Sequence, residues 1–169
     1  MQPEKVFILA SYPYSLINFR MEFLKELINK NYEVHVGAPF EKKDLHVVEK
    51  LNSYNIRTHI VNIDRYNINF LKEFLLIFSL IFTLIKVKPK TIISYTVKPV
   101  IYGTLCASVL RIKNKFNIIT GLGFFFIGKK DFKKKIIRRL ILILYKIVIK
   151  SNTKTFFKNK DDLKLFKKL

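Results

Sequence analysis

The sequence has little cysteine, glycine or proline, with one, five and five of these residues among 169. A single cysteine, Cys106, allows no internal disulfide and no zinc site made from several cysteines. So few glycines and prolines exclude a collagen-like or linker sequence, and an apolar fraction of 50% excludes a disordered chain. The N-terminus lacks the pattern of a signal peptide, so we expect a cytoplasmic location. The length fits a single domain, residues 1–169, with a hydrophobic core of its own.

Acidic residues are scarce as well, with 12 Asp and Glu against 32 Lys and Arg and a net charge of +20. Nearly all of this charge lies in the second half: residues 1–85 sum to +1 and residues 86–169 to +19. A lysine-rich composition explains many of the lysines but not the missing acids. The asymmetry favours a surface that faces an anionic polymer or a membrane. Nucleic acid is the competing partner, although the sequence has no zinc-finger spacing, RRM signature or helix-turn-helix pattern.

Short apolar runs alternate with longer helical patterns along the whole chain. We expect strands at residues 5–11, 33–38, 56–63, 91–95, 116–120 and 154–158. We expect helices at residues 17–30, with Ser15 as N-cap, and at 42–54, 70–88, 99–111, 131–150 and 160–168. This alternation predicts an α/β fold, a Rossmann-like open parallel sheet of about six strands with helices on both faces. Ligands of such sheets bind beyond the carboxyl ends of the strands, here the loops at 11–18, 95–99 and 120–128.

Two of the predicted helices are apolar enough to raise the question of a membrane. Residues 74–85 give only 12 uncharged positions, whereas a spanning helix needs about 20, so a core or interfacial helix is favoured. In the helix at 131–150, Leu142, Tyr145 and Ile149 fall on the face that also carries Lys134, Arg138 and Arg139. This mixture is typical of an interfacial helix whose basic side chains reach lipid phosphates. The alternative is a core helix with two buried sides and a solvated charged stripe.

The loops contain no P-loop, GxSxG or HExxH motif, so no catalytic residue is assigned. Lys98 follows the fourth strand next to Pro99, where a fixed cation suits an anionic ligand, and Arg20 offers a second cation near the same edge. The GLG stretch at 121–123 predicts a tight turn that either approaches a phosphate or sugar or is simply a turn. His35, His46 and His59 lie outside these loops, which favours core or surface roles.

Several motifs resemble a known family: SLINFR at 15–20, SYTVKPVIYG at 94–103, ITGLGFFF at 119–126 and FKNKDD at 157–162. In this order and spacing they are similar to the N-terminal half of bacterial family 4 glycosyltransferases, in particular enzymes that extend lipid-linked oligosaccharides for capsule, lipopolysaccharide or protein glycosylation. The loop SYPYS replaces the glycines that many members carry after the first strand. SYTVKP replaces a segment that contains a histidine in others.

The resemblance implies one half of a GT-B enzyme, in which an N-terminal domain binds the acceptor and a C-terminal domain binds the nucleotide-sugar donor. It implies glycosyl transfer with retention and without a metal or other cofactor. By position, it assigns substrate binding to Asn18, Arg20, Lys98, Gly121, Leu122 and Gly123. The donor domain is expected to be absent from this chain, so the chain alone is expected to be inactive.

The function expected from the sequence is therefore the acceptor-binding half of a glycosyltransferase that works on a lipid-linked or cell-surface polysaccharide acceptor. We expect it on the inner face of the plasma membrane, bound to an anionic membrane surface through Lys134, Arg138, Arg139, Leu142, Tyr145 and Ile149. The donor would be bound by a missing domain or a partner chain. The alternative is a basic, non-catalytic module that binds nucleic acid or is the membrane-recruited partner subunit of a split glycosyltransferase.

Overall fold

The six apolar runs form one parallel sheet, as predicted. The computed structural model describes residues 2–65, 69–121 and 132–167, with side chains for all of these except 132–134 and 165. The strands are β1 (Lys5–Leu9), β2 (Glu33–Ala38), β3 (Arg57–Ile60), β4 (Thr91–Tyr95), β5 (Asn114–Ile119) and β6 (Lys154–Phe157). They pair in the order β3-β2-β1-β4-β5-β6, with every neighbouring pair parallel.

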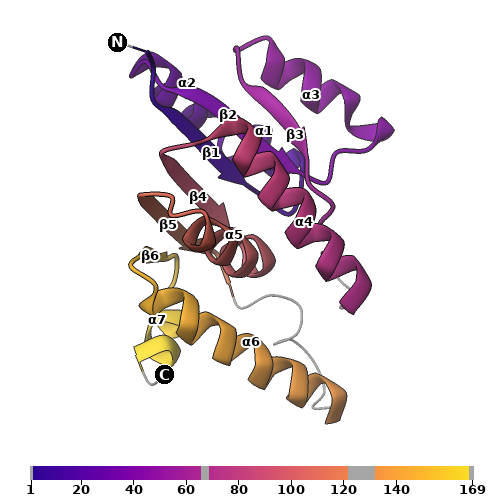
Figure 1. Cartoon of the computed structure of the whole chain (residues 1–169), viewed down its shortest axis with the longest axis vertical. Coiled ribbons are helices and arrows are strands. Elements are labelled where there is room, and N and C mark those ends of the chain that lie inside the picture. Colours follow the sequence, from indigo (N-terminus) through magenta and orange to yellow (C-terminus); the bar gives the residue numbers. More distant parts are fainter. Residues whose placement is uncertain (1, 66–68, 122–131, 168–169) are drawn as a thin grey trace.

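The helices cover both faces of the sheet (Figure 1). They are α1 (Tyr14–Phe19), α2 (Met21–Asn29), α3 (Leu45–Asn52) after the short 3-10 helix η1 (Lys42–Asp44), α4 (Phe70–Val87), α5 (Val97–Val109), α6 (Phe132–Lys150) and α7 (Lys160–Lys167). None of the helices in the described ranges is both long and apolar enough to span a bilayer.

Strand β1 shows why the sheet is buried on both faces. Val6 and Ile8 point into a core cluster with α1, α2 and α3, whereas Phe7 and Leu9 point into a second cluster with α4 and α5. All four side chains are nearly inaccessible to solvent, because successive strand residues face opposite sides and both sides carry helices. A third cluster joins α5, α6 and α7 with Ile119 of β5 and Phe157 of β6.

Three predicted features differ in detail. The helix expected at 17–30 is two helices, α1 and α2, because the backbone leaves helical geometry at Arg20 (φ −129°, ψ −2°). Ser15 is not an N-cap, because it lies inside α1 and its hydroxyl donates to the Tyr12 carbonyl at 2.6 Å. The third strand is limited to four residues, Arg57–Ile60.

Candidate functional site

The carboxyl ends of β1 and β4 meet at the point where the strand order reverses. The loops that follow them are joined by a hydrogen bond of 2.9 Å between the hydroxyls of Ser11 and Thr96. Thr96 has φ 72° and ψ 173°, a region that is essentially restricted to glycine and costs roughly 1–3 kcal/mol. Strain of this kind is concentrated at ligand sites, and ligands of open α/β sheets bind at this edge. The structure therefore supports the location that the strand order predicts for the site.

Arg20 lies at this edge, on the side of α1 and α2. Its side chain is nearly buried, its Nη1 donates to the Ser15 carbonyl at 2.8 Å, and its guanidinium carbon lies 4.0 Å from the ring centre of Tyr95. Burial lowers the pKa of Arg20, and the contact with Tyr95 opposes this effect. Among the described residues, Nε of Arg20 has no hydrogen-bond partner. Tyr95, the last residue of β4, therefore contacts the cationic side chain of Arg20 at the switch point, where the strand order reverses.

Lys98 lies on the other side of the sheet, in the first turn of α5. It is nearly buried and forms an ion pair with Glu73 in the first turn of α4. The second carboxylate oxygen of Glu73 has no hydrogen-bond partner within the described residues. Burial first, and then the neighbouring Glu73, raises the pKa of Tyr102. Lys98 is therefore part of a buried ionic contact between two helices, and its role toward an acceptor remains a prediction.

The other predicted substrate-binding residues make fewer contacts in the described structure. Asn18 is exposed near the end of α1. Gly121 follows β5 with φ +151°, a conformation that side chains rarely adopt, and a Cβ atom there would meet no neighbour. Leu122 and Gly123 lie outside the described residues. Arg20 and Lys98 contact different helical layers, so the structure does not bring the two cations into one cluster.

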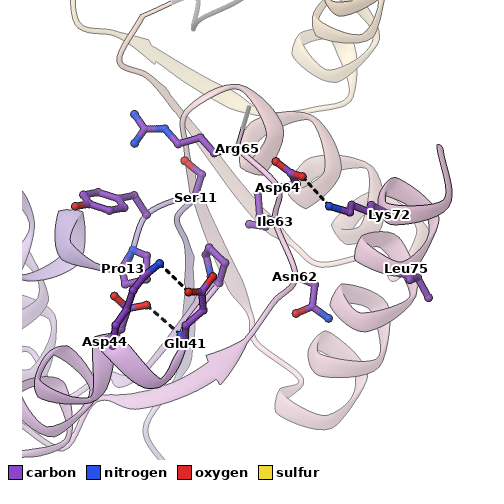
Figure 2. A pocket seen from close by; sticks show the side chains of 13 residues that line it. Ser11, Pro13, Glu41, Asp44, Asn62, Ile63, Asp64, Arg65, Lys72 and Leu75 are labelled. Carbon is purple, nitrogen blue, oxygen red and sulfur yellow. Dashed lines mark hydrogen bonds and ion pairs between the residues drawn. The ribbon is translucent and has the colours of Figure 1, made fainter. Parts of the chain in front are cut away.

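A pocket of about 640 Å³ opens at the carboxyl ends of β1, β2 and β3 (Figure 2). The loop after β1, the loop after β2, the loop after β3 and the first turns of α4 all contribute to its wall. Its lining residues are Ser11, Tyr12, Pro13, Pro39, Glu41, Lys43, Asp44, Asn62, Ile63, Asp64, Arg65, Lys72 and Leu75. Ser11 connects this pocket to the strained Thr96, so pocket and switch point form one continuous edge.

Charged groups of both signs line this pocket. Asp64 forms an ion pair with Lys72, with 3.1 Å between Oδ2 and Nζ, and Glu41 forms one with Lys43, with 2.7 Å between Oε2 and Nζ. The backbone N–H of Glu41 donates to Asp44 at 3.0 Å, which fixes the loop after β2. Carboxylates, ammonium groups and an amide in one cavity suit a ligand with many hydroxyls, because such a ligand both donates and accepts hydrogen bonds.

An aromatic wall adds to the polar one. The Tyr12 ring is half exposed, stacks on Tyr14 at 5.6 Å and lies 5.5 Å from the guanidinium carbon of Arg65. The sequence analysis missed Lys72 and the loop at 39–44. The rule that ligands bind at carboxyl strand ends applies equally to β2, and applying it there would have found that loop.

Helix α6 does not present the face that the sequence analysis expects. Tyr145 is fully buried, with its ring against Phe166 of α7 at 4.9 Å and 84°, so the prediction that it faces a membrane is wrong. Leu142 and Ile149 are half-buried, Arg138 is half-buried, Arg139 is exposed, and the side chain of Lys134 lies outside the described residues. Packing of α7 on this side of α6 explains the difference.

The apolar side chains that α6 exposes are different ones. Ile136, Leu140, Ile143 and Ile147 are between 44% and 55% exposed. Ile141, Tyr145 and Val148 fill the core instead. The exposed stripe of α6 is therefore purely aliphatic and has basic neighbours.

His35 and His59 lie on strands β2 and β3, whereas His46 lies in the first turn of α3, with its ring 4.9 Å from that of Tyr14. His35 is buried, shares a hydrogen bond of 2.8 Å with His59 and contacts Glu33 at 3.0 Å, which confirms a core role for it. Burial is the main reason that the pKa of His59 falls to about 4. Within the described ranges, no three His, Cys, Asp or Glu side chains are grouped so that they could hold a metal ion.

The sequence matches one protein family and one characterised enzyme over most of its length. The sequence model of the family described as "Glycosyl transferase 4-like" matches residues 8–159. The chain is 28% identical over 158 residues to the N,N'-diacetylbacillosaminyl-diphospho-undecaprenol alpha-1,3-N-acetylgalactosaminyltransferase of Campylobacter jejuni. The match covers 92% of this chain and 40% of that protein, so the chain spans well under half of the relative's length.

Solved structures share the fold at low sequence identity. The UDP-GlcNAc 2-epimerase of Methanocaldococcus jannaschii is 17% identical with a TM-score of 0.54, over 98% of this chain and 52% of that one. The UDP-GlcNAc 2-epimerase of Neisseria meningitidis gives 17% and 0.53, over 83% and 38%. The calicheamicin glycosyltransferase gives 9% and 0.51, over 83% and 38%. These likenesses show the Rossmann-like architecture of one half of a GT-B fold.

Proposed function

Because this chain belongs to the glycosyl transferase 4-like family, we propose that it forms the acceptor-binding half of a glycosyltransferase that extends a lipid-linked saccharide. The observation that carries the proposal is the mixed polar pocket at the carboxyl ends of β1, β2 and β3. The name of the Campylobacter relative, which describes a sugar acceptor linked to undecaprenyl diphosphate, supports this class of acceptor.

In this proposal the pocket and the switch point bind different parts of the acceptor. The saccharide enters the pocket, where Asp64, Glu41 and Asn62 accept or donate hydrogen bonds to sugar hydroxyls and Tyr12 offers a flat apolar ring. The diphosphate lies toward Arg20, whose charge is held at the edge by Tyr95. The acceptor hydroxyl is then held at the rim of the sheet, where a donor sugar can reach it.

The donor is bound by a second domain of GT-B type, from the same protein or a partner. In this arrangement the present domain supplies no nucleotide site and performs no transfer alone; it binds and orients the acceptor. Glycosyl transfer needs no metal here, because cationic side chains and helix N-termini stabilise the leaving diphosphate. We further propose that the domain works at the cytoplasmic surface of the membrane in which the acceptor lipid resides.

The test is binding of the purified chain to a polyprenyl-diphospho-saccharide in detergent, compared with the same polyprenyl diphosphate without sugar. We expect saturable binding of the saccharide form, and a loss of about tenfold in Asp64→Asn, because hydrogen bonds to charged groups contribute roughly 1.5–3 kcal/mol. Asp161→Asn, on the exposed face of α7, is the matched control and should bind normally. Equal binding by both variants would place the saccharide elsewhere, and tighter binding of nucleic acid at matched salt would favour a basic binding module instead.

A further inference from the structure

Helix α4 exposes a continuous apolar face. Its largest exposed side chains are Phe70, Leu71, Phe74, Leu75, Phe78, Phe82 and Ile85, each between 51% and 85% exposed. Phe74 and Phe78 contact each other on this surface, with ring centres 4.5 Å apart. On the opposite side of the helix, Leu76, Leu80 and Leu84 pack into the second core cluster against the sheet. The helix is therefore apolar on its outer side as well as on its inner side.

A helix that simply covers a sheet normally turns charged residues to water. Between Phe74 and Ile85, α4 has none, and charge returns only at its ends, with Lys72 and Lys86 both exposed. Lysines that bracket an apolar stretch are typical of a helix at a membrane interface, where their long side chains reach the headgroups. The length of the uncharged stretch is too short for a span, which leaves insertion parallel to the surface.

Helix α6 repeats this pattern in the same layer. Its exposed Ile136, Leu140, Ile143 and Ile147 lie among the exposed basic residues Lys135, Arg139, Lys146 and Lys150. Both α4 and α6 pack against α5, and Figure 1 shows the three helices side by side on one face of the sheet. The N-terminal halves of α4 and α6 extend past the sheet on the side of the carboxyl strand ends (Figure 1).

The charge on this layer selects the kind of surface it can meet. Among the described side chains, Glu73 is the only acid in α4 and α6, and it is buried against Lys98. A second copy of the chain would bring one basic face against another, which is unfavourable. An anionic bilayer offers apolar depth to the phenylalanines and phosphates to the lysines and arginines at once.

We propose that the outer face of the α4–α5–α6 layer binds anionic phospholipid, with the phenylalanines of α4 inserted below the headgroups and the basic residues of α6 on the phosphates. Lys72 and Leu75 belong both to α4 and to the wall of the pocket. The role of membrane binding in acceptor delivery rests on the proposed function. The inserted helix therefore places the pocket beside the bilayer, so that the lipid of the acceptor stays in the membrane while its saccharide enters the pocket.

A tryptophan reporter tests the insertion directly, because the sequence contains no tryptophan. Phe78→Trp places the fluorophore on the exposed face of α4, and Phe23→Trp places it on α2, which is exposed on the opposite face of the sheet. With mixed phosphatidylglycerol–phosphatidylcholine vesicles, we expect a blue shift and quenching by acyl-brominated lipid for Trp at 78 and neither for Trp at 23. Equal behaviour of the two reporters would overturn the proposal.

A second measurement uses loss of binding. Phe74→Ser combined with Phe78→Ser should lower the vesicle partition coefficient at least tenfold, whereas Phe23→Ser should leave it within about twofold, since only buried apolar surface contributes to insertion. Far-UV circular dichroism and the melting temperature show that each variant is folded. Unchanged partitioning of the double variant overturns the proposal, as does self-association in which the phenylalanines bind a second copy instead. The vesicles contain no acceptor lipid, so this result is independent of the acceptor-binding test in detergent.

Discussion

The ion pair between Glu73 and Lys98 gives the sharpest prediction about stability. Both side chains are only 10% exposed, so each charge has lost most of its hydration and depends on the other. Lys98→Met removes the ammonium and leaves the carboxylate buried. Removing one member of a buried pair typically costs about 3–5 kcal/mol, and we expect a loss near the lower limit because both side chains keep some contact with solvent.

Urea unfolding at neutral pH measures this loss, and a thermal melt should show a decrease of about 6–12 °C in the melting temperature, from about 3 kcal/mol at roughly 2–4 °C per kcal/mol for a chain of this size. The matched control is Lys30→Met, which removes a pair with Glu26 whose side chains are 63% and 58% exposed. Exposed pairs contribute about 0–1 kcal/mol, so this control should unfold almost as the wild type.

The double variant Glu73→Gln/Lys98→Met removes both charges and should recover most of the loss. If Lys98→Met costs less than about 1 kcal/mol, the pair is not desolvated as described and the reasoning fails. The double variant also separates the two roles of Lys98. If this lysine contacts the acceptor diphosphate, the stable double variant binds acceptor at least tenfold more weakly; if it binds normally, the ion pair is purely structural.

Three further outcomes are expected. The pKa of His59 is about 4 in the fold against 6.5 when unfolded, so the unfolded chain binds more protons between these values and stability falls as the pH drops from about 6.5 to 4. At about 1.4 kcal/mol per pKa unit, and allowing for the half-exposed ring, the loss is roughly 1–2 kcal/mol. Chemical denaturation at both pH values measures this loss. His59→Gln should reduce the slope without removing it, because burial also lowers the pKa of His35. Gly103→Ala should lower the free energy of unfolding by about 1–2 kcal/mol, because a Cβ atom would lie 2.5 Å from the hydroxyl of Ser94. Adding Ser94→Ala should restore most of this stability. An unchanged Tm in the single variant would contradict the close approach. Arg20→Met should weaken binding of a polyprenyl-diphospho-saccharide by about tenfold or more, whereas Arg57→Met, at the amino end of β3, should leave it unchanged; equal affinities would remove Arg20 from the site.

The fold was predictable because its strands are short, apolar on both faces and separated by helical patterns. The apolar stretch KVFIL needs helices on both sides of β1, and that requirement defines the architecture. The break at Arg20 was not predictable, because apolar residues continue at helical spacing on both sides of it. The break coincides with the contacts of the guanidinium with Ser15 and Tyr95, which residue spacing does not reveal.

The site was predictable as a place and less so as a set of residues. Its position follows from the strand order, whereas the partner of Lys98 lies 25 residues away on another helix. Tyr145 was assigned wrongly to the membrane-facing side of α6, because the helical pattern alone does not tell which side of the helix α7 covers. Tyr145 illustrates this: it lies among basic residues on a helical wheel and at the centre of a core cluster in the fold.

The hydrogen bond between Ser11 and Thr96 has a mechanical consequence for the choice of acceptor. It is a side-chain tether across the rim, added to the backbone pairing of β1 with β4 that already joins the two halves of the sheet, so the loops after these two strands stay side by side where the pocket begins. If the acceptor saccharide occupies the pocket as proposed, the segments after β2 and β3, which form the far wall of the pocket, set the space available to it. Relatives that take larger saccharides should differ in the length of those two segments and keep the tether.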